Sequence, residues 1–188
     1  MAGFDDATVL VTGAASGIGL ATALMLRDRG ARLIVMDRDA DGLARFDDMQ
    51  RIVGDVADPT LWAGADLGGL THAAINAGIA AGGPPIADLD FAEWRRVMDV
   101  NLDGAFLSLA AAMRAIRATG RGGAVAVTAS IAGIKPQPGT AAYSASKAGP
   151  VASTRPHPTI MKGSASATCT RLRSDKEPMS QNTTSSAA

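Results

Sequence analysis

The sequence of 188 residues has a single cysteine, Cys169, few aromatic residues and no net charge. One cysteine excludes a disulfide within the chain. Only 4% of the residues are aromatic although 47% are hydrophobic, which indicates a core of small, largely alanine side chains. The 18 basic residues balance the 18 acidic ones, so no overall field attracts nucleic acid or an anionic membrane. We therefore expect no nucleic-acid partner.

Long apolar runs and a secretory signal are also lacking. The most apolar stretch, 104–116, is interrupted by Ser108 and Arg114, so it is too polar for a membrane helix. Asp5 and Asp6 stand where a secretory signal would carry positive charge. We expect a soluble protein of the cytoplasm with no membrane partner.

The amino-acid composition of the chain changes near Gly149. Residues 1–149 hold 20 of the 21 glycines, whereas residues 150–188 hold 13 serines or threonines and 4 of the 9 prolines. The large apolar residues of the second part follow neither a helical nor a strand period, so they do not predict a buried face. We expect one domain over 1–149, with a helix arrested at Pro150, and a mostly disordered tail over 150–188.

Along residues 1–149, short apolar runs typical of buried strands alternate with stretches whose apolar residues have helical spacing. Short β-branched runs predict strands at 8–12, 32–36, 49–53, 70–75 and 124–128. Apolar residues at helical spacing from Ile18 to Met25, followed by Gly30 as a helix C-cap, predict a helix between the first two strands. Further helices are predicted near 58–65, 91–100 and 102–118. This alternation predicts an α/β fold with a doubly wound parallel sheet, Rossmann-like, in which the first strand is central. The second and third strands should lie on one side of it and the fourth and fifth on the other, because crossovers are right-handed.

A glycine-rich turn follows the first predicted strand. It reads Thr12-Gly-Ala-Ala-Ser-Gly-Ile-Gly19. Glycines at 13, 17 and 19 allow a sharp turn and a close approach of the backbone to a pyrophosphate at the next helix N-terminus. Taken alone, the same glycines also suit an ordinary strand-to-helix turn.

Asp37 ends the second predicted strand, 18 residues after Gly19. A carboxylate there accepts hydrogen bonds from the ribose hydroxyls of adenosine and repels a 2′-phosphate. Although Arg38 is adjacent, the position favours NAD over NADP as the cofactor. Alone, Asp37 would be read as a solvated loop acid.

The only tyrosine, Tyr143, precedes Lys147 by four residues. On a helix the two side chains share one face. An ammonium group beside a phenol stabilises the phenolate, as a general acid or base requires. On spacing alone, an inconsequential surface pair is an equally good reading.

Together these motifs resemble the short-chain dehydrogenase/reductase family, classical type. Residues 12–19 resemble its Thr-Gly-x-x-x-Gly-x-Gly turn, and Asn76-Ala-Gly78 resembles its Asn-Ala-Gly segment. Asn101 resembles its central asparagine, and Ser130 with Tyr143-x-x-x-Lys147 resembles its catalytic residues. The five motifs occur in the family's order within residues 7–149.

The resemblance implies a role for each matching residue. Tyr143 would exchange the hydroxyl proton, Lys147 would stabilise the phenolate and bind the nicotinamide ribose, Ser130 would orient the substrate oxygen, and Asn101 would anchor a relay water. The implied cofactor site comprises Gly13, Ser16, Gly17, Ile18, Gly19, Asp37, Asp55, Val56, Asn76, Ala77, Gly78, Tyr143 and Lys147, with no metal. Without the resemblance, Ser130 reads as a strand-end hydroxyl, Asn101 as a helix cap and Asn76 as a turn residue.

Two departures from the family's pattern stand out. Ile75 replaces a second asparagine, and nothing after Gly149 resembles the family's last strands, so the chain reads as truncated or altered there. We predict an NAD-dependent oxidoreductase that interconverts a secondary alcohol and a ketone, its small-molecule partners. The alternatives are a nucleotide-binding remnant with little or no turnover, or a non-enzymatic scaffold. The family commonly forms homo-oligomers through helices that begin near Asn101 and Tyr143, and we expect no stable assembly here.

Overall fold

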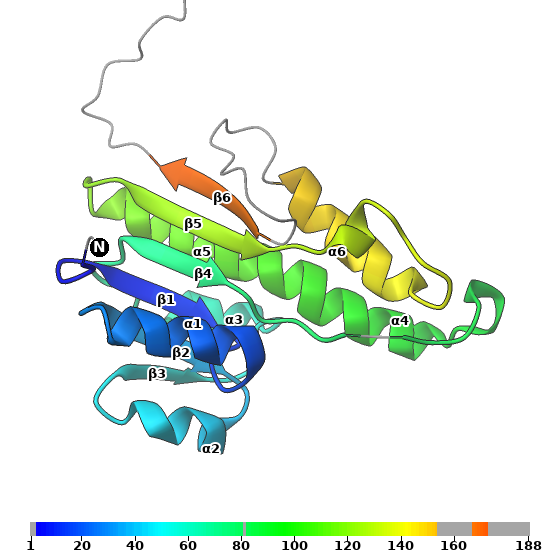
Figure 1. Cartoon of the computed structure of the whole chain (residues 1–188), viewed down its shortest axis with the longest axis horizontal. Coiled ribbons are helices and arrows are strands. Elements are labelled where there is room, and N and C mark those ends of the chain that lie inside the picture. The colour runs from blue at the N-terminus through cyan, green and yellow to red at the C-terminus, as the bar shows by residue number, and fades with distance from the viewer. Residues whose placement is uncertain (1–2, 81, 154–166, 173–188) are drawn as a thin grey trace, which may run out of the picture.

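A computed structural model describes residues 3–80, 82–153 and 167–172 and contains one six-stranded sheet in the order β3-β2-β1-β4-β5-β6 (Figure 1). The first five strands run parallel. They are β1 (Thr8–Thr12), β2 (Arg32–Asp37), β3 (Gln50–Val53), β4 (His72–Ile75) and β5 (Gly123–Thr128). The predicted fold class and the order of these five strands are therefore confirmed.

Within the described residues, six α-helices connect and flank these strands. They are α1 (Gly17–Arg27), α2 (Ala40–Leu43), α3 (Pro59–Gly64), α4 (Phe91–Met98), α5 (Gly104–Ala118) and α6 (Ala141–Ser153). Short helical turns lie at η1 (Ala44–Phe46), η2 (Ile86–Asp88), η3 (Asp99–Asp103) and η4 (Ile131–Gly133). In the described ranges, no helix combines the length and the apolar character needed to span a membrane.

Alternation along the strands divides the core between the two faces of the sheet. On β1, Val9 and Val11 pack with α1 and α2, while Leu10 belongs to the cluster under α3 and α5. Figure 1 shows α1 in front of the sheet and α5 behind it. Because β1 is buried on both faces, it reads as an unbroken apolar run with threonine at each end.

The sixth strand corrects the expectation of a tail without packed structure. Residues 167–172 form β6 (Ala167–Leu172), which pairs antiparallel with β5 from Gly123↔Leu172 to Thr128↔Ala167. Strand β5 would otherwise have unpaired backbone N–H and C=O groups, and any extended segment can pair with them whatever its side chains. The spacing of apolar residues in the sequence therefore could not predict β6. The other residues of the predicted disordered tail, 154–166 and 173–188, lie outside the described residues.

The end of α6 corrects a second expectation. Pro150 was predicted to arrest this helix, yet α6 runs on to Ser153. Proline removes one intrahelical hydrogen bond. However, Pro150 is buried, and α6 packs against α4, η3 and η4. We attribute the continuation of the helix to this packing.

A π-helical turn separates α4 from α5. The sequence predicts helices at 91–100 and 102–118, but residues 99–103 form the wider turn η3. A π-turn inserts an extra residue into the helical ladder and frequently marks a functional position. Here it contains Asn101, whose side chain is fully buried.

Candidate functional site

A cleft of about 400 Å³ opens at the carboxyl ends of the parallel strands. In doubly wound folds ligands bind at this edge, where the strand order reverses between β1 and β4. Twelve predicted site residues line the cleft: Gly13, Ser16, Gly17, Ile18, Asp37, Asp55, Val56, Asn76, Ala77, Gly78, Tyr143 and Lys147. Residues separated by more than 130 positions in the chain thus share one cavity.

The glycine turn forms the floor of the cleft between β1 and α1. Gly13 has φ +71°, and a Cβ there would lie 2.9 Å from the Ala77 Cα, so both the conformation and the space require glycine. At Gly17, φ is +53° and a Cβ would meet nothing within 4 Å. The turn therefore leaves open space in front of the N-terminus of α1.

The first backbone N–H groups of α1 face that space. Such groups have no partner within their own helix, and they favour an anion there. Ser16 is the N-cap, but its side chain makes no capping hydrogen bond. Gly19 lies behind the turn, on the first turn of α1, and it is buried against Gly13 rather than lining the cleft. A diphosphate fits the turn because backbone donors and a glycine surface meet there.

Asp37 ends β2 and lines the adenosine side of the cleft expected from the sequence. Its Oδ2 accepts the Ala15 N–H at 3.0 Å, and its Oδ1 accepts the Asp39 N–H at 3.1 Å. Each carboxylate oxygen has a further acceptor position, so Asp37 can also receive hydroxyl donors. The two backbone bonds hold the carboxylate at the edge of the glycine turn.

Asp55 and Val56 follow β3 on the same side of the cleft. The Asp55 Oδ1 accepts the Ala57 N–H at 2.9 Å. The Val56 carbonyl accepts the Trp62 Nε1–H at 2.8 Å, which ties the segment to α3. These bonds fix the wall against which an adenine would lie.

The segment 76–78 crosses the middle of the cleft. The Thr12 Oγ1 accepts the N–H groups of Asn76 and Ala77 at 3.0 and 3.1 Å, which joins the end of β1 to the segment after β4. The Thr128 hydroxyl donates to the Asn76 Oδ1 at 3.1 Å. Asn76 is thus held from the neighbouring strand β5 as well.

Tyr143 and Lys147 project from α6 toward the cleft. The Lys147 Nζ donates to the Thr128 carbonyl at 3.2 Å and lies 5.9 Å from the centroid of the Tyr143 ring. Lys147 is only 5% exposed, and this burial lowers its pKa from the ordinary lysine value. Both side chains line the same cleft, with the buried Lys147 Nζ on the side of the Tyr143 ring.

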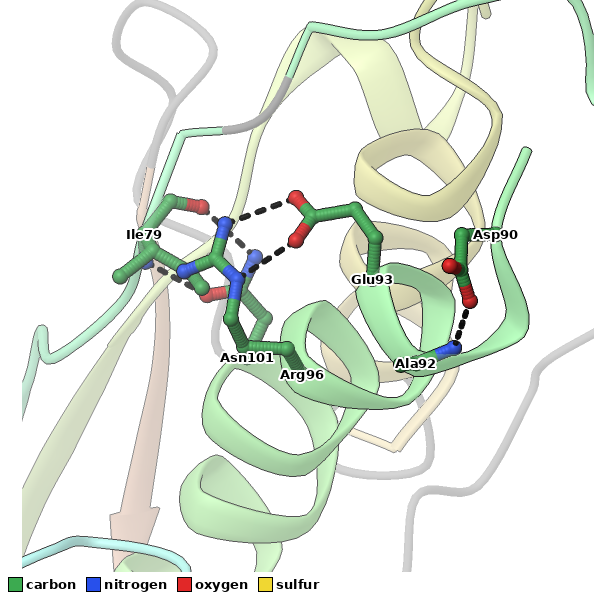
Figure 2. A network of polar contacts seen from close by, with 6 residues as sticks. All are labelled: Ile79, Asp90, Ala92, Glu93, Arg96 and Asn101. Carbon is green, nitrogen blue, oxygen red and sulfur yellow. Dashed lines mark hydrogen bonds and ion pairs between the residues drawn. The ribbon is translucent and has the colours of Figure 1, made fainter.

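Asn101 stands behind the cleft rather than in its lining. Its Oδ1 accepts the Ile79 N–H at 2.7 Å, and its Nδ2 donates to the Ile79 carbonyl at 2.9 Å (Figure 2). The Nδ2 also donates to the Ser146 Oγ at 3.1 Å. The nearby surface of α4 is held separately, by the Asp90 cap on Ala92 and the ion pair between Glu93 and Arg96. Asn101 therefore fixes the backbone next to Gly78.

Ser130 also lies outside the cleft lining. It is the N-cap of η4, just beyond β5, and its Oγ accepts the Ala132 N–H at 3.2 Å. A Cβ on Gly133 would collide with the Lys147 backbone, so η4 packs directly on α6. Ser130 is therefore on an element that touches the helix of Tyr143 and Lys147.

Several lining residues were missed by reasoning from the sequence. They are Met36, Arg38, Gly54, Ile79, Ala80, Val100 and Thr128. Most directly follow or end a parallel strand, so the rule that ligands bind beyond strand carboxyl ends was the signal that could have found them. Ser146 does not line the cleft. Its connection to the cleft is a hydrogen bond to Asn101, and the strand-end rule does not predict such a bond.

Comparison with known proteins gives consistent matches. The family model for short chain dehydrogenases matches residues 7–157. A cis-4-hydroxycyclohexanecarboxylate dehydrogenase from Sinomonas cyclohexanicum is 39% identical in an alignment 163 residues long; the match covers 78% of this chain and 64% of that protein. The chain thus spans about 64% of the length of this curated relative.

Two solved structures share the fold. Levodione reductase has a TM-score of 0.75 at 32% identity, with 81% of this chain and 65% of that chain covered. An NAD⁺-bound xylitol dehydrogenase has a TM-score of 0.73 at 32% identity, with 80% and 63% covered. With the family model covering most of the chain and the strand order and glycine turn in place, this chain belongs to the short-chain dehydrogenase family.

Proposed function

We propose that this protein is an NAD-dependent oxidoreductase that interconverts a secondary alcohol and a ketone. The observation that carries the proposal is the single cleft lined by the glycine turn, Asp37, Tyr143 and Lys147. A dinucleotide site and a proton-transfer pair in one cavity are the two requirements of such a reaction.

The residues of the cleft fit a nicotinamide dinucleotide. The glycine turn would hold the diphosphate, and Asp37 would bind the adenosine ribose. Asp55 and Val56 would contact the adenine, and the segment 76–78 would line the cofactor cleft. When bound, the nicotinamide accepts or supplies the hydride. Asp37 favours NAD, because a 2′-phosphate would meet its carboxylate.

Tyr143 and Lys147 supply the proton chemistry in this proposal. The Tyr143 phenolate takes the proton of the substrate alcohol as the ketone forms and so becomes the hydroxyl, which returns the proton in the reverse direction. The Lys147 ammonium would stabilise the negative charge that Tyr143 carries before it takes the proton, and it would bind the ribose next to the nicotinamide. The Thr128 carbonyl holds Lys147 in position.

Ser130 and Asn101 have supporting roles. The Ser130 hydroxyl would donate to the substrate oxygen and stabilise its developing charge. In Asn101, three hydrogen-bonding positions of the amide are taken by Ile79 and Ser146. One lone pair on its Oδ1 remains, and there we place the relay water near Lys147.

The substrate class that we propose is a secondary alcohol on a carbon ring. The support is the name of one relative, a dehydrogenase of cis-4-hydroxycyclohexanecarboxylate, which is 39% identical to this chain.

A second function, NAD binding with little turnover, also has an observation in its favour. Ser130 is absent from the cleft lining, and its Oγ is engaged by the Ala132 N–H. If Ser130 does not reach the substrate oxygen, the site keeps its cofactor while losing most of its rate.

One pair of measurements separates the two functions. NAD binding is measured by calorimetry, and NADH formation is followed with cyclohexanol and cis-4-hydroxycyclohexanecarboxylate. Binding together with NADH formation supports the oxidoreductase, whereas binding without NADH formation supports the second function. Absence of NAD binding contradicts both.

A further inference from the structure

Ser146 lies on α6 between the two proposed proton-transfer residues in the sequence, yet it is not part of the cleft lining. Its side chain is fully buried. The Ser146 Oγ donates to the Tyr143 carbonyl at 2.8 Å and accepts from the Asn101 Nδ2 at 3.1 Å. A serine that only bonds back to its own helix is common and needs no further role. The bond to Asn101, 45 residues earlier in the chain, is the distinguishing feature.

Asn101 extends this link to the wall of the cleft. Its amide holds the Ile79 backbone through both the N–H and the carbonyl. Three segments therefore meet at one buried amide: the stretch after β4, the π-turn η3 and helix α6. The Nδ2 has two protons, and Ile79 and Ser146 take both. Without the Ser146 hydroxyl, one of these buried donors would lose its partner.

The held backbone lies directly against Lys147. A Cβ on Gly78 would be 3.0 Å from the Asn101 Oδ1 and 3.2 Å from the Lys147 Nζ. A displacement of the Gly78–Ile79 backbone therefore changes the space around the ammonium group. Gly78 and Ile79 also line the cleft, so the same displacement changes the cofactor's wall.

We propose that Ser146 is a positioning residue that sets, through Asn101, the distance between the Gly78–Ile79 backbone and the Lys147 ammonium. Its effect on the reaction rests on the proposed oxidoreductase function, but its effect on the backbone does not. The hydroxyl couples the helix that carries Tyr143 and Lys147 to the wall opposite them, and the π-turn places Asn101 between the two.

The test compares Ser146→Ala with a matched control, Ser144→Ala. Ser144 is also buried on α6, but its hydroxyl pairs with the hydroxyl of Thr140, the residue just before this helix, with the two oxygens 2.9 Å apart. The first readout is hydrogen exchange of the Ile79 amide, which donates to Asn101. We expect exchange to become about tenfold faster in Ser146→Ala and to stay unchanged in Ser144→Ala.

The second readout is the pH profile of kcat. In Ser146→Ala we expect kcat to fall by about tenfold to a hundredfold, with a shifted pH profile and little change in the KM for NAD. Ser146→Cys, which is nearly isosteric and a weaker acceptor, should lie between wild type and Ser146→Ala. It also serves as the test variant if Ser146→Ala does not fold.

The two readouts distinguish failure of this inference from failure of the proposed function. If wild type shows no turnover, the proposed function fails, and the Ile79 exchange rate alone decides the inference. Unchanged Ile79 exchange in both Ser146 variants would overturn it, as would equal effects of Ser146→Ala and Ser144→Ala.

Discussion

Individual side chains of the candidate site, both in the cleft lining and beside it, are held by backbone groups more than by one another. Asp37 accepts two backbone N–H groups, Lys147 donates to the Thr128 carbonyl, and Ser130 accepts the Ala132 N–H. Backbone partners keep a functional side chain in one orientation without competing for its charge. The chemistry of the site thus depends on the positions of the strand ends.

The charge of Asp37 gives a prediction about cofactor choice. We expect NAD to bind about tenfold or more tightly than NADP, because a 2′-phosphate close to a carboxylate costs on the order of 1–4 kcal/mol. Asp37→Asn should reduce this preference, while Asp41→Asn, an exposed charge-matched control outside the cleft lining, should not. Dissociation constants from calorimetry check this, and tighter binding of NADP by wild type would contradict it.

Strand β4 carries a titratable group into the sheet. The His72 ring meets Phe4 edge-on, with centroids 6.2 Å apart, and its Nδ1 lies 2.9 Å from the Thr71 Oγ1. Burial lowers the pKa of His72 below its ordinary value of 6.5. Burial in the strand therefore disfavours the charged form of the ring relative to an exposed histidine.

The lowered pKa of His72 predicts how stability varies with pH. Between the folded pKa and 6.5, the unfolded chain binds more protons than the folded one. The free energy of unfolding should therefore fall as the pH drops through 6.5, and His72→Gln should show a flatter profile. Urea unfolding between about pH 7.5 and 5.5 checks this, since carboxylates titrate mainly below that window. Equal slopes in both proteins would show that His72 does not contribute.

Individual elements also show how far the sequence could predict the fold. Strand β1 was predicted with its observed limits, because its β-branched run is buried on both faces. Strand β4 begins at His72 rather than at residue 70, since Gly69 takes a positive φ and turns the chain there. The π-turn at Asn101 was not predicted, because no local pattern distinguishes it from continuous α-helix.

The part of the candidate site that could be predicted consists of residues whose type is suited to one chemical role, such as a glycine in a tight turn or a carboxylate that accepts hydroxyl donors. Gly13, Asp37, Tyr143 and Lys147 met in one cleft as expected. Asn101 and Ser146 were harder, since their buried bond joins residues 45 positions apart. Contacts of this kind depend on how two helical elements pack against each other. The spacing of residues within one helix cannot predict that packing.

The sheet ends at β6, so the molecule does not expose β5 as an edge. All six residues of β5 pair with residues of β6 in an antiparallel register. An unpaired edge is a template for pairing with another chain. Segment 167–172 therefore covers the outer edge of β5 and becomes the last strand of the described sheet.

This pairing predicts the effect of a proline in β6. Thr170 pairs with Val125, and Thr170→Pro removes a backbone donor and disrupts the ladder. We expect β5 to become exposed and larger species to accumulate with rising concentration. Thr170→Ser, which retains the N–H, should behave as wild type. Sedimentation velocity checks this, and an identical distribution in both variants would show that β6 does not protect the edge.

The central claim is that Tyr143 transfers the proton in a cleft that binds NAD. The most direct measurement is the turnover of Tyr143→Phe with NAD and a ring alcohol, alongside its affinity for NAD. Phenylalanine keeps the ring near the Lys147 ammonium and removes only the hydroxyl. We predict a fall in kcat of about a hundredfold or more, with the dissociation constant of NAD within about twofold of wild type. A variant that keeps most of the wild-type rate would contradict the account, because the proton would then pass through another group.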